Sequence, residues 1–168
     1  MVDYLVTNFY PEIHEAFPLT NDQNIKMRAR VMYEELVKST VKMVADWQCY
    51  GFCHGVLNTD NMSMLGLTID YGPYGFLEHY DPMYICNHSD NEGRYRYEAQ
   101  PDICKWNLGK LAEALDPLLP LSESKAFLEE NYDVFFKEIY NPKLAQKLGL
   151  QDPKNPNEPN MLACADQA

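Results

Sequence analysis

Basic residues are scarce in this chain. The 168 residues include 14 lysines and arginines against 25 aspartates and glutamates, which gives a formal net charge of −11 at pH 7. Proteins that bind nucleic acid need basic groups to neutralise the phosphate backbone, and no basic run is present here. The composition therefore argues against a nucleic-acid surface. It also leaves few cations for a polyphosphate ligand, so any nucleotide would depend on a bound metal ion.

Long apolar runs are also missing. A membrane-spanning helix needs about 20 consecutive apolar residues, and the sequence contains no such stretch. The first residues include an acid, Asp3, and do not show the pattern of a signal or transit peptide. We therefore expect no membrane partner and, for the chain as written, a cytoplasmic location.

The cysteines lack the arrangement of a disulfide framework. There are five of them, an odd number, and no two form a CxxC pair. Cys49, Cys53 and His54 leave a zinc site open as an alternative, but their spacing does not favour it. Reduced thiols in a compact domain are the preferred interpretation.

Glycine-rich phosphate-binding motifs are absent as well. The eight glycines form neither GxGxxG nor a Walker pattern, and no lysine stands in a V-A-I-K strand. A phosphotransfer site needs a cover over the phosphates and a cation for their charge. The sequence provides neither part in a recognisable form.

What the chain does contain is an informative central stretch, residues 53–75. It starts with a polar turn, CHGVLNTDN, continues with an apolar run at residues 64–69, and ends in DYGP, which starts at Asp70. The apolar run predicts a short buried strand. Asn61 and Asp70 stand nine positions apart, one on each side of this run. Oxygen ligands of this kind suit Mg²⁺, which proteins commonly hold through one or two ligands plus substrate phosphates.

The same stretch follows a protein-kinase pattern, H-R-D-L-x-x-x-N followed by D-F-G. His54 and Asn61 take the first and last positions of the catalytic loop, and Asp70 starts a D-Y-G. Asn61 and Asp70 are therefore the predicted metal ligands, with Asp70 also facing the nucleotide. The alternatives are a loop amide bonded to backbone for Asn61 and a turn-capping carboxylate for Asp70. His54 is expected to hold the loop rather than to react.

The middle of the pattern departs from kinases. Gly55 replaces the arginine, and Val56 stands where kinases carry the catalytic aspartate. Taken alone, this departure indicates a pseudokinase. Asp60, directly before Asn61, is a substitute carboxylate that can serve as general base if it lies within hydrogen-bond reach of the attacking hydroxyl. The alternative for Asp60 is a simple Asx turn.

The departure is itself informative, because the run GFCHGVLNTDNMSMLGLTIDYGPYGFLEHYDPMYICNHSDNEGRY closely resembles the selenoprotein O family of kinase-like protein adenylyltransferases. The resemblance extends over about residues 1–150 and is most specific over residues 54–90. It implies transfer of AMP from ATP to Ser, Thr or Tyr hydroxyls of proteins, with Mg²⁺ or Mn²⁺ as cofactor. It also implies a mitochondrial location for a eukaryotic member.

The resemblance predicts the C-terminal lobe of a protein-kinase-like fold for residues 1–150, mainly α with a small β element and with the N-lobe absent. Apolar periodicity predicts helices at residues 24–50, 100–119 and 123–140, the last capped by Ser122 and followed by a short helix that Pro142 opens. Asn21 is one of the N-cap candidates for the first of these helices. Residues 151–168 are rich in proline and asparagine and predict a disordered tail.

Two other functions remain open from the sequence. One is a protein kinase that transfers the γ-phosphate with the same metal ligands. The other is a non-catalytic pseudokinase fragment that acts by binding proteins. Because family members carry the phosphate-binding parts upstream of the position that matches Met1, we expect a truncated piece of an enzyme that is inactive alone.

Overall fold

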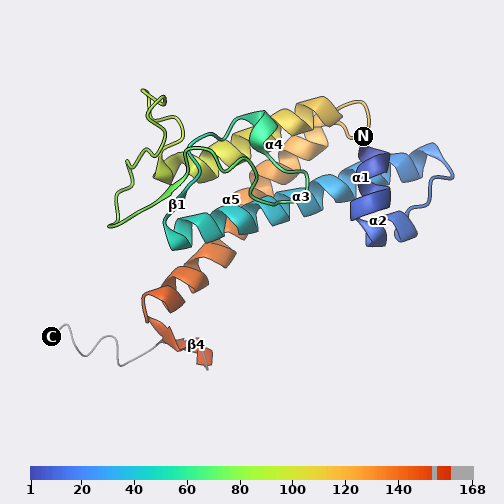
Figure 1. The fold of residues 1–168 in the computed structure, drawn as a ribbon. Coiled ribbons are helices and arrows are strands. Elements are labelled where there is room, and N and C mark those ends of the chain that lie inside the picture. The colour runs from blue at the N-terminus through green and yellow to red at the C-terminus, as the bar shows by residue number, and fades with distance from the viewer. Residues whose placement is uncertain (153–154, 160–168) are drawn as a thin grey trace.

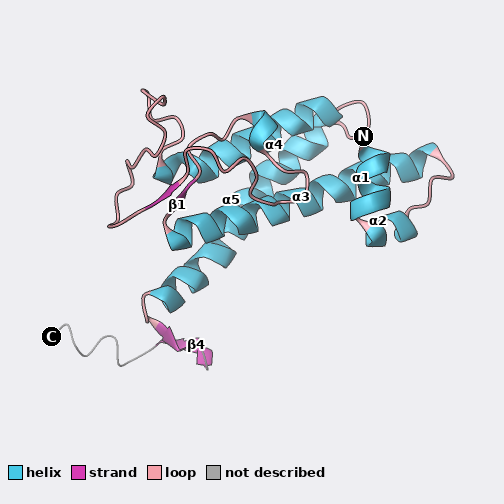
Figure 2. Ribbon diagram, viewed as in Figure 1, coloured by secondary structure: helices cyan, strands magenta, loops and turns pink. Residues whose placement is uncertain are grey.

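The structure, a computed structural model, describes residues 1–152 and 155–159, and within them the chain is mainly helical (Figure 1). The helices are α1 (Val2–Phe9), α2 (Pro11–Ala16), α3 (Asp22–Tyr50), α4 (Gln100–Leu115) and α5 (Leu121–Lys147). Two 3-10 turns, η1 (Thr59–Asn61) and η2 (Tyr97–Ala99), lie in the long irregular stretch between α3 and α4. The strands form two antiparallel pairs, β1 (Phe52–Cys53) with β2 (Gly75–Phe76) and β3 (Gln151–Asp152) with β4 (Asn155–Pro159) (Figure 2). The predicted class, mainly α with a small β element, is confirmed.

Helix α3 is the central element and agrees with the predicted helix. The side chain of Asn21 accepts a hydrogen bond from the backbone N–H of Asn24 at 2.9 Å, which caps the first turn. Gly51 ends the helix with a left-handed backbone, φ +72°, a conformation that glycine adopts without steric cost. Figure 1 shows α1 and α2 at one end of α3 and β1 at the other.

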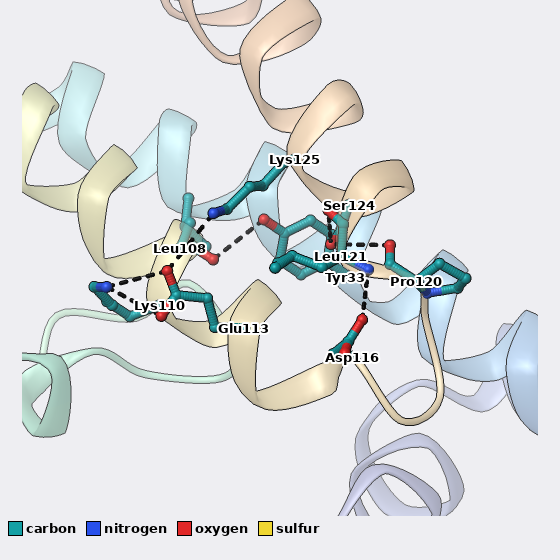
Figure 3. A network of polar contacts seen from close by, with 9 residues as sticks. All are labelled: Tyr33, Leu108, Lys110, Glu113, Asp116, Pro120, Leu121, Ser124 and Lys125. Carbon is teal, nitrogen blue, oxygen red and sulfur yellow. Dashed lines mark hydrogen bonds and ion pairs between the residues drawn. The ribbon is translucent and has the colours of Figure 1, made fainter.

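The core lies where α3, α4 and α5 pack together. Buried apolar side chains from all three helices form one cluster, which includes Met32, Leu36, Val37, Val41, Leu108, Ala112, Leu115, Leu128 and Tyr132. Tyr33 donates its hydroxyl to the carbonyl of Leu108 at 3.2 Å, so its buried polar atom has a partner (Figure 3). The three helices therefore form a rigid base for the loops that follow α3.

The start of α5 differs from the prediction. The sequence predicts a helix from residue 123 with Ser122 as its N-cap, but the helix begins two residues earlier, at Leu121. Asp116 Oδ1 accepts a hydrogen bond from the backbone N–H of Leu121 at 2.8 Å (Figure 3). The carboxylate at the end of α4 thus accepts a hydrogen bond from the first turn of α5, as a serine cap would.

The end of α5 also differs, because Pro142 lies inside a continuous helix instead of opening a new one. Proline removes one helical hydrogen bond and usually breaks a helix interior. Here the residues after it are tied to the end of α3. Lys143 pairs with Asp46, and Lys147 donates to the carbonyl of Cys49 at 2.6 Å. These tertiary contacts keep the helix going past the proline.

The predicted strand at residues 64–69 is wrong. The segment is irregular, and its side chains at Leu67 and Ile69 are 58% and 38% exposed. Gly66 has a φ of +64° and lies so close to α3 that an added Cβ would meet Ser39 at 2.5 Å. Thr68 accepts a hydrogen bond from the indole N–H of Trp47 at 3.0 Å. The segment therefore runs against a helix, and no strand of the described residues pairs with it.

The paired strands β3 and β4 fall in the stretch that the sequence predicts as a disordered tail, and residues 153–154 and 160–168 of that tail lie outside the described residues. None of the helices in the described part of the chain has the length and apolar character needed to cross a membrane.

Candidate active site

Residues 52–58, which comprise β1 and the loop that links it to η1, are held by side chains from three other parts of the chain. Most of their backbone carbonyls accept a hydrogen bond from a side chain. The donors are Gln100 to Phe52 (2.9 Å), Cys86 to Cys53 (3.3 Å), Asn87 to Gly55 (3.1 Å), Asn61 to Val56 (3.0 Å) and Asn107 to Leu57 (2.9 Å). Because only its first two residues pair with another strand, this mostly buried segment needs such donors. We call residues 52–58 the anchored loop.

Gln100, in the first turn of α4, makes the most central of these contacts. Its side chain is fully buried, donates to the carbonyl of Phe52, and accepts from the backbone N–H of His54 at 2.8 Å. The side-chain amide of Gln100 thus pairs with two backbone groups, the carbonyl before Cys53 and the N–H after it. The contact joins the anchored loop to the helical base.

The backbone conformation of Gly55 and its close contact with Cys86 exclude an arginine at this position, where kinases carry one. Its φ is +81°, and a Cβ at this position would meet the sulfur of Cys86 at 2.5 Å. Both the backbone conformation and the available space require glycine.

His54 is buried and structural, as expected. Its Nε2 lies 2.8 Å from the carbonyl oxygen of Ile69, and its Nδ1 lies 3.4 Å from the backbone N–H of Val56. Because a carbonyl can only accept, Nε2 carries the proton and Nδ1 is the acceptor. The ring also packs on Trp47, with centroids 5.6 Å apart. His54 therefore ties the residue before Asp70 to the anchored loop.

Asp60 and Asn61 lie on η1. The side-chain N–H of Asn61 is committed to the carbonyl of Val56, so its orientation is fixed and Oδ1 is left without a hydrogen bond from any described residue. The alternative interpretation, an amide bonded to loop backbone, therefore holds for the side-chain N–H of Asn61 but not for its Oδ1. Asp60 is exposed, and its carboxylate makes no hydrogen bond or ion pair with the described residues.

Asp70 has an unusual backbone. With a φ of +55° it is the one non-glycine residue in the described part of the chain with a positive φ. The carbonyl of Asp70 accepts from the N–H of Gly72 at 2.8 Å, which closes a tight turn around Tyr71. Non-glycine residues held in this region carry strain and gather at functional sites. The carboxylate is exposed and free of ion pairs with the described residues.

The segments that carry the two predicted metal ligands are both tied by hydrogen bonds to residues 54–56. Val56 holds the side chain of Asn61, and His54 holds the carbonyl that precedes Asp70. No hydrogen bond joins Asp60, Asn61 and Asp70 directly within the described residues. Nor do three or more His, Cys, Asp or Glu side chains gather there as a metal cluster, so the zinc alternative finds no support in that part of the chain.

An open aromatic surface lies beside Asp70. Phe52 packs against Tyr71, Tyr74 and Phe76 with ring centroids 5.4 to 6.1 Å apart. Together with residues of α3 these rings line a cavity of about 460 Å³. Aromatic pairs of this kind add stability beyond their buried area, and here they support the turn that carries Asp70.

The thiol of Cys53, within the anchored loop, interacts with that of Cys86. The hydrogen bond between them lowers the pKa of Cys86 and raises that of Cys53, whose burial raises it further. Cys86 is partly exposed, whereas Cys53 is buried. Cys86 is therefore the more readily ionised of the pair.

Sequence reasoning missed the residues that hold the anchored loop from α4. Gln100 and Asn107 are seven positions apart, so they share one face of the helix. Both are buried polar residues within an apolar stripe. A polar residue on a buried stripe needs a hydrogen-bond partner, and that signal is present in the sequence.

Known proteins resemble this chain over most of its length. The sequence matches the family Protein adenylyltransferase SelO over residues 1–166. It is 57% identical over 150 residues to a protein of Mus musculus named Protein adenylyltransferase SelO, mitochondrial, and 48% identical over 162 residues to SelO-1 of Danio rerio, also named mitochondrial. It is 42% identical over 161 residues to a Bordetella petrii protein named Protein nucleotidyltransferase YdiU.

These alignments cover 89%, 96% and 95% of this chain, respectively. They cover 22% of the mouse and zebrafish proteins and 32% of the bacterial one, so the chain spans between a fifth and a third of these relatives. The match extends over the anchored loop, η1 and the Asp70 turn together. The chain belongs to the SelO family of protein adenylyltransferases.

Proposed function

We propose that this chain carries the metal-binding and general-base part of a protein adenylyltransferase, which transfers AMP from ATP to a Ser, Thr or Tyr hydroxyl of a protein. The proposal rests on one observation: the segments that carry Asn61 and Asp70 are both hydrogen-bonded to the anchored loop. Val56 fixes the amide of Asn61, and His54 fixes the carbonyl that precedes Asp70. The description of the matching family, Protein adenylyltransferase SelO, supports the proposal.

The proposed metal ligands are Asn61 and Asp70, with Asp70 also facing the nucleotide. Asn61 keeps Oδ1 available because its N–H is already bonded, and Asp70 presents an exposed carboxylate on a tight hydrogen-bonded turn. Two oxygen donors of this type fit Mg²⁺, with Mn²⁺ as a second choice. When bound, such an ion supplies charge neutralisation at the phosphates of ATP.

Asp60 is the proposed general base. Its exposed carboxylate lies next to Asn61 on the same 3-10 turn and has no competing ion pair among the described residues. It would accept the proton of the protein hydroxyl while that oxygen forms a bond to the α-phosphorus of ATP. The bond from the α-phosphorus to the bridging oxygen breaks, and pyrophosphate leaves with the electron pair.

The proposed architecture for residues 1–150 is the C-terminal lobe of a kinase-like fold. In such a lobe a long helix leads into the catalytic loop. Helix α3 ends directly before β1, and α4 supports the anchored loop through Gln100 and Asn107. The mitochondrial names of the eukaryotic relatives suggest the same compartment for a eukaryotic bearer of this chain.

The experiment is label transfer with the purified 168-residue chain, Mg²⁺, a protein acceptor and ATP labelled on either the α- or the γ-phosphate. Any label that the chain transfers should come from the α-phosphate and should be lost in both Asp70→Asn and Asp60→Asn. Asp22→Asn is the matched control, because Asp22 is an exposed acid far from the site in sequence, at the start of α3. Label from the γ-phosphate alone would instead identify a protein kinase and overturn the proposal.

Metal binding needs its own measurement, since a folded chain without transfer would point to the non-catalytic alternative. Backbone amide signals can be followed by NMR during a Mg²⁺ titration. We expect shifts at Asn61 and Asp70 that saturate and that disappear in Asp70→Asn but remain in Asp22→Asn. A folded chain that shows neither transfer nor such shifts would mean that this part of the protein has no catalytic function by itself.

A further inference from the structure

Residues 62–69 join the two proposed metal ligands, and we call them the linking segment. Side chains of α3 and of the anchored loop hold its later part. In its earlier part, residues 62–66, the hydroxyl of Tyr10 donates to the carbonyl of Met64 at 2.7 Å. Within the described part of the chain, the other hydrogen bonds of residues 62–66 run to Ser63, inside the segment itself. Tyr10 is therefore the side chain that ties this part of the linking segment to the rest of the fold.

The backbone of Tyr10 is held between two helices. Its N–H donates to the carbonyl of Val6 at 3.2 Å, at the end of α1, and its carbonyl accepts from the N–H of His14 at 3.0 Å, in α2. Both helices bury apolar side chains in the core, Val2 and Val6 from α1 and Ile13 from α2. The side chain of Tyr10 thus extends from a backbone that two packed helices fix.

Arg28 of α3 holds both short helices on the helical base. Its side chain is fully buried. Its Nε donates to the carbonyl of Phe17, directly after α2, at 2.5 Å, and one terminal nitrogen lies 2.8 Å from Nδ1 of His14. The other terminal nitrogen lies 3.7 Å from the carboxylate of Asp3 on α1. Because a buried guanidinium needs such partners, these contacts fix α1 and α2 on α3.

The hydroxyl of Tyr10 remains a donor at neutral pH. Burial raises the pKa of Tyr10, and the nearby carboxylate of Glu35 raises it further. An exposed tyrosine already has a pKa of about 10. Since a backbone carbonyl can only accept, the contact with Met64 needs the hydroxyl proton, and that proton is retained.

We propose that Tyr10 is a positioning residue of the candidate site, whose hydroxyl fixes the linking segment and thereby the relative position of Asn61 and Asp70. Tyr10 acts through the carbonyl of Met64 and not on the ligand atoms themselves. Two ligands that must reach one ion bind it more weakly when the chain between them is mobile, because binding must then also order that chain. The inference rests on the proposed function, since the site it concerns is the proposed metal site.

Tyr10→Phe removes the hydroxyl and keeps the ring. The amides of Leu65 and Gly66, which are both bonded to Ser63, should then exchange with solvent about five-fold faster, the effect of one hydrogen bond. In the NMR titration described above, the affinity for Mg²⁺ should fall at least about three-fold, a part of the same effect.

Tyr33→Phe is the matched control, because Tyr33 also donates its hydroxyl to a backbone carbonyl, that of Leu108 in the helical base. Its side chain is fully buried, so this variant should lower the free energy of unfolding at least as much as Tyr10→Phe does. It should nevertheless leave both the Mg²⁺ affinity and the exchange of Leu65 and Gly66 unchanged. The comparison separates positioning of the site from a general loss of stability.

Equal Mg²⁺ affinity in Tyr10→Phe and the unmodified chain, or equal exchange of Leu65 and Gly66 in the two variants, would overturn the role of Tyr10. If Mg²⁺ shifts no signal of the unmodified chain, the metal site of the proposed function fails instead. In that case faster exchange in Tyr10→Phe would still support the tie between Tyr10 and the linking segment, and unchanged exchange would refute it.

Discussion

Gln100 and His54 are 46 positions apart in the sequence, yet the side-chain oxygen of Gln100 accepts the backbone N–H of His54 at 2.8 Å. The same amide donates to the carbonyl of Phe52 at 2.9 Å. Both partners are buried backbone groups of the anchored loop. This single side chain connects the helical base to the loop that organises the candidate site.

Replacing Gln100 by leucine should destabilise the chain. Leucine is similar in size but leaves two buried backbone groups unpaired, which costs about 2–4 kcal/mol. Urea unfolding followed by circular dichroism measures the effect. Gln23→Leu is the control, because Gln23 is exposed on α3, and it should stay within about 0.5 kcal/mol of the unmodified chain. Equal stability of the two variants would mean that the Gln100 contacts contribute little.

His54→Phe should loosen the Asp70 turn. Phenylalanine retains an aromatic ring next to Trp47 but cannot donate to the carbonyl of Ile69. The amide of Gly72, bonded within the turn, should then exchange with solvent about ten-fold faster, a difference of roughly one hydrogen bond. Hydrogen exchange read by NMR tests this. His79→Phe, at an exposed loop position, should leave that amide unchanged.

The left-handed backbone of Asp70 predicts a specific order of stability among variants. At a φ of +55°, alanine is disfavoured by its Cβ and glycine is not. Asp70→Gly should therefore be about 1 kcal/mol more stable than Asp70→Ala. At Asp60, which has no positive φ, the order should reverse, because glycine loses more entropy on folding. Thermal unfolding of the four variants gives the comparison, and the same order at both positions would contradict it.

The thiols should differ in reactivity with pH. The hydrogen bond from Cys53 lowers the pKa of Cys86, and burial raises the pKa of Cys104 to about 12. A lower pKa means more thiolate at a given pH, and the thiolate is the reactive form. Among the four described cysteines, iodoacetamide should thus alkylate Cys86 first as the pH rises from about 6 to about 9, as read by mass spectrometry.

The control for this prediction is Cys53→Ala, which removes the hydrogen bond that favours the Cys86 thiolate. The onset of Cys86 alkylation should then move to higher pH. An unchanged pH profile in this variant, or modification of Cys104 as fast as Cys86, would contradict the assigned cause.

The sequence alone determined those features that depend on neighbouring residues. Asn21 and Gly51 set the ends of α3 through local capping, and the spacing of apolar residues along it set the buried face. The motif of His54, Asn61 and Asp70, with the residues around it, is sufficient to indicate the family. Each of these features involves residues close together in the sequence, so it can be recognised without the tertiary structure.

Tertiary structure decided what depends on distant partners. The apolar run at residues 64–69 lies against α3 and not in a sheet, because Gly66 allows close approach to Ser39. Helix α5 continues through Pro142 because Lys143 and Lys147 bind the end of α3. The anchored loop depends on Gln100 and Asn107, whose partners are about 50 residues away. A buried polar group must find a partner, but which one it finds is determined only when the helices pack.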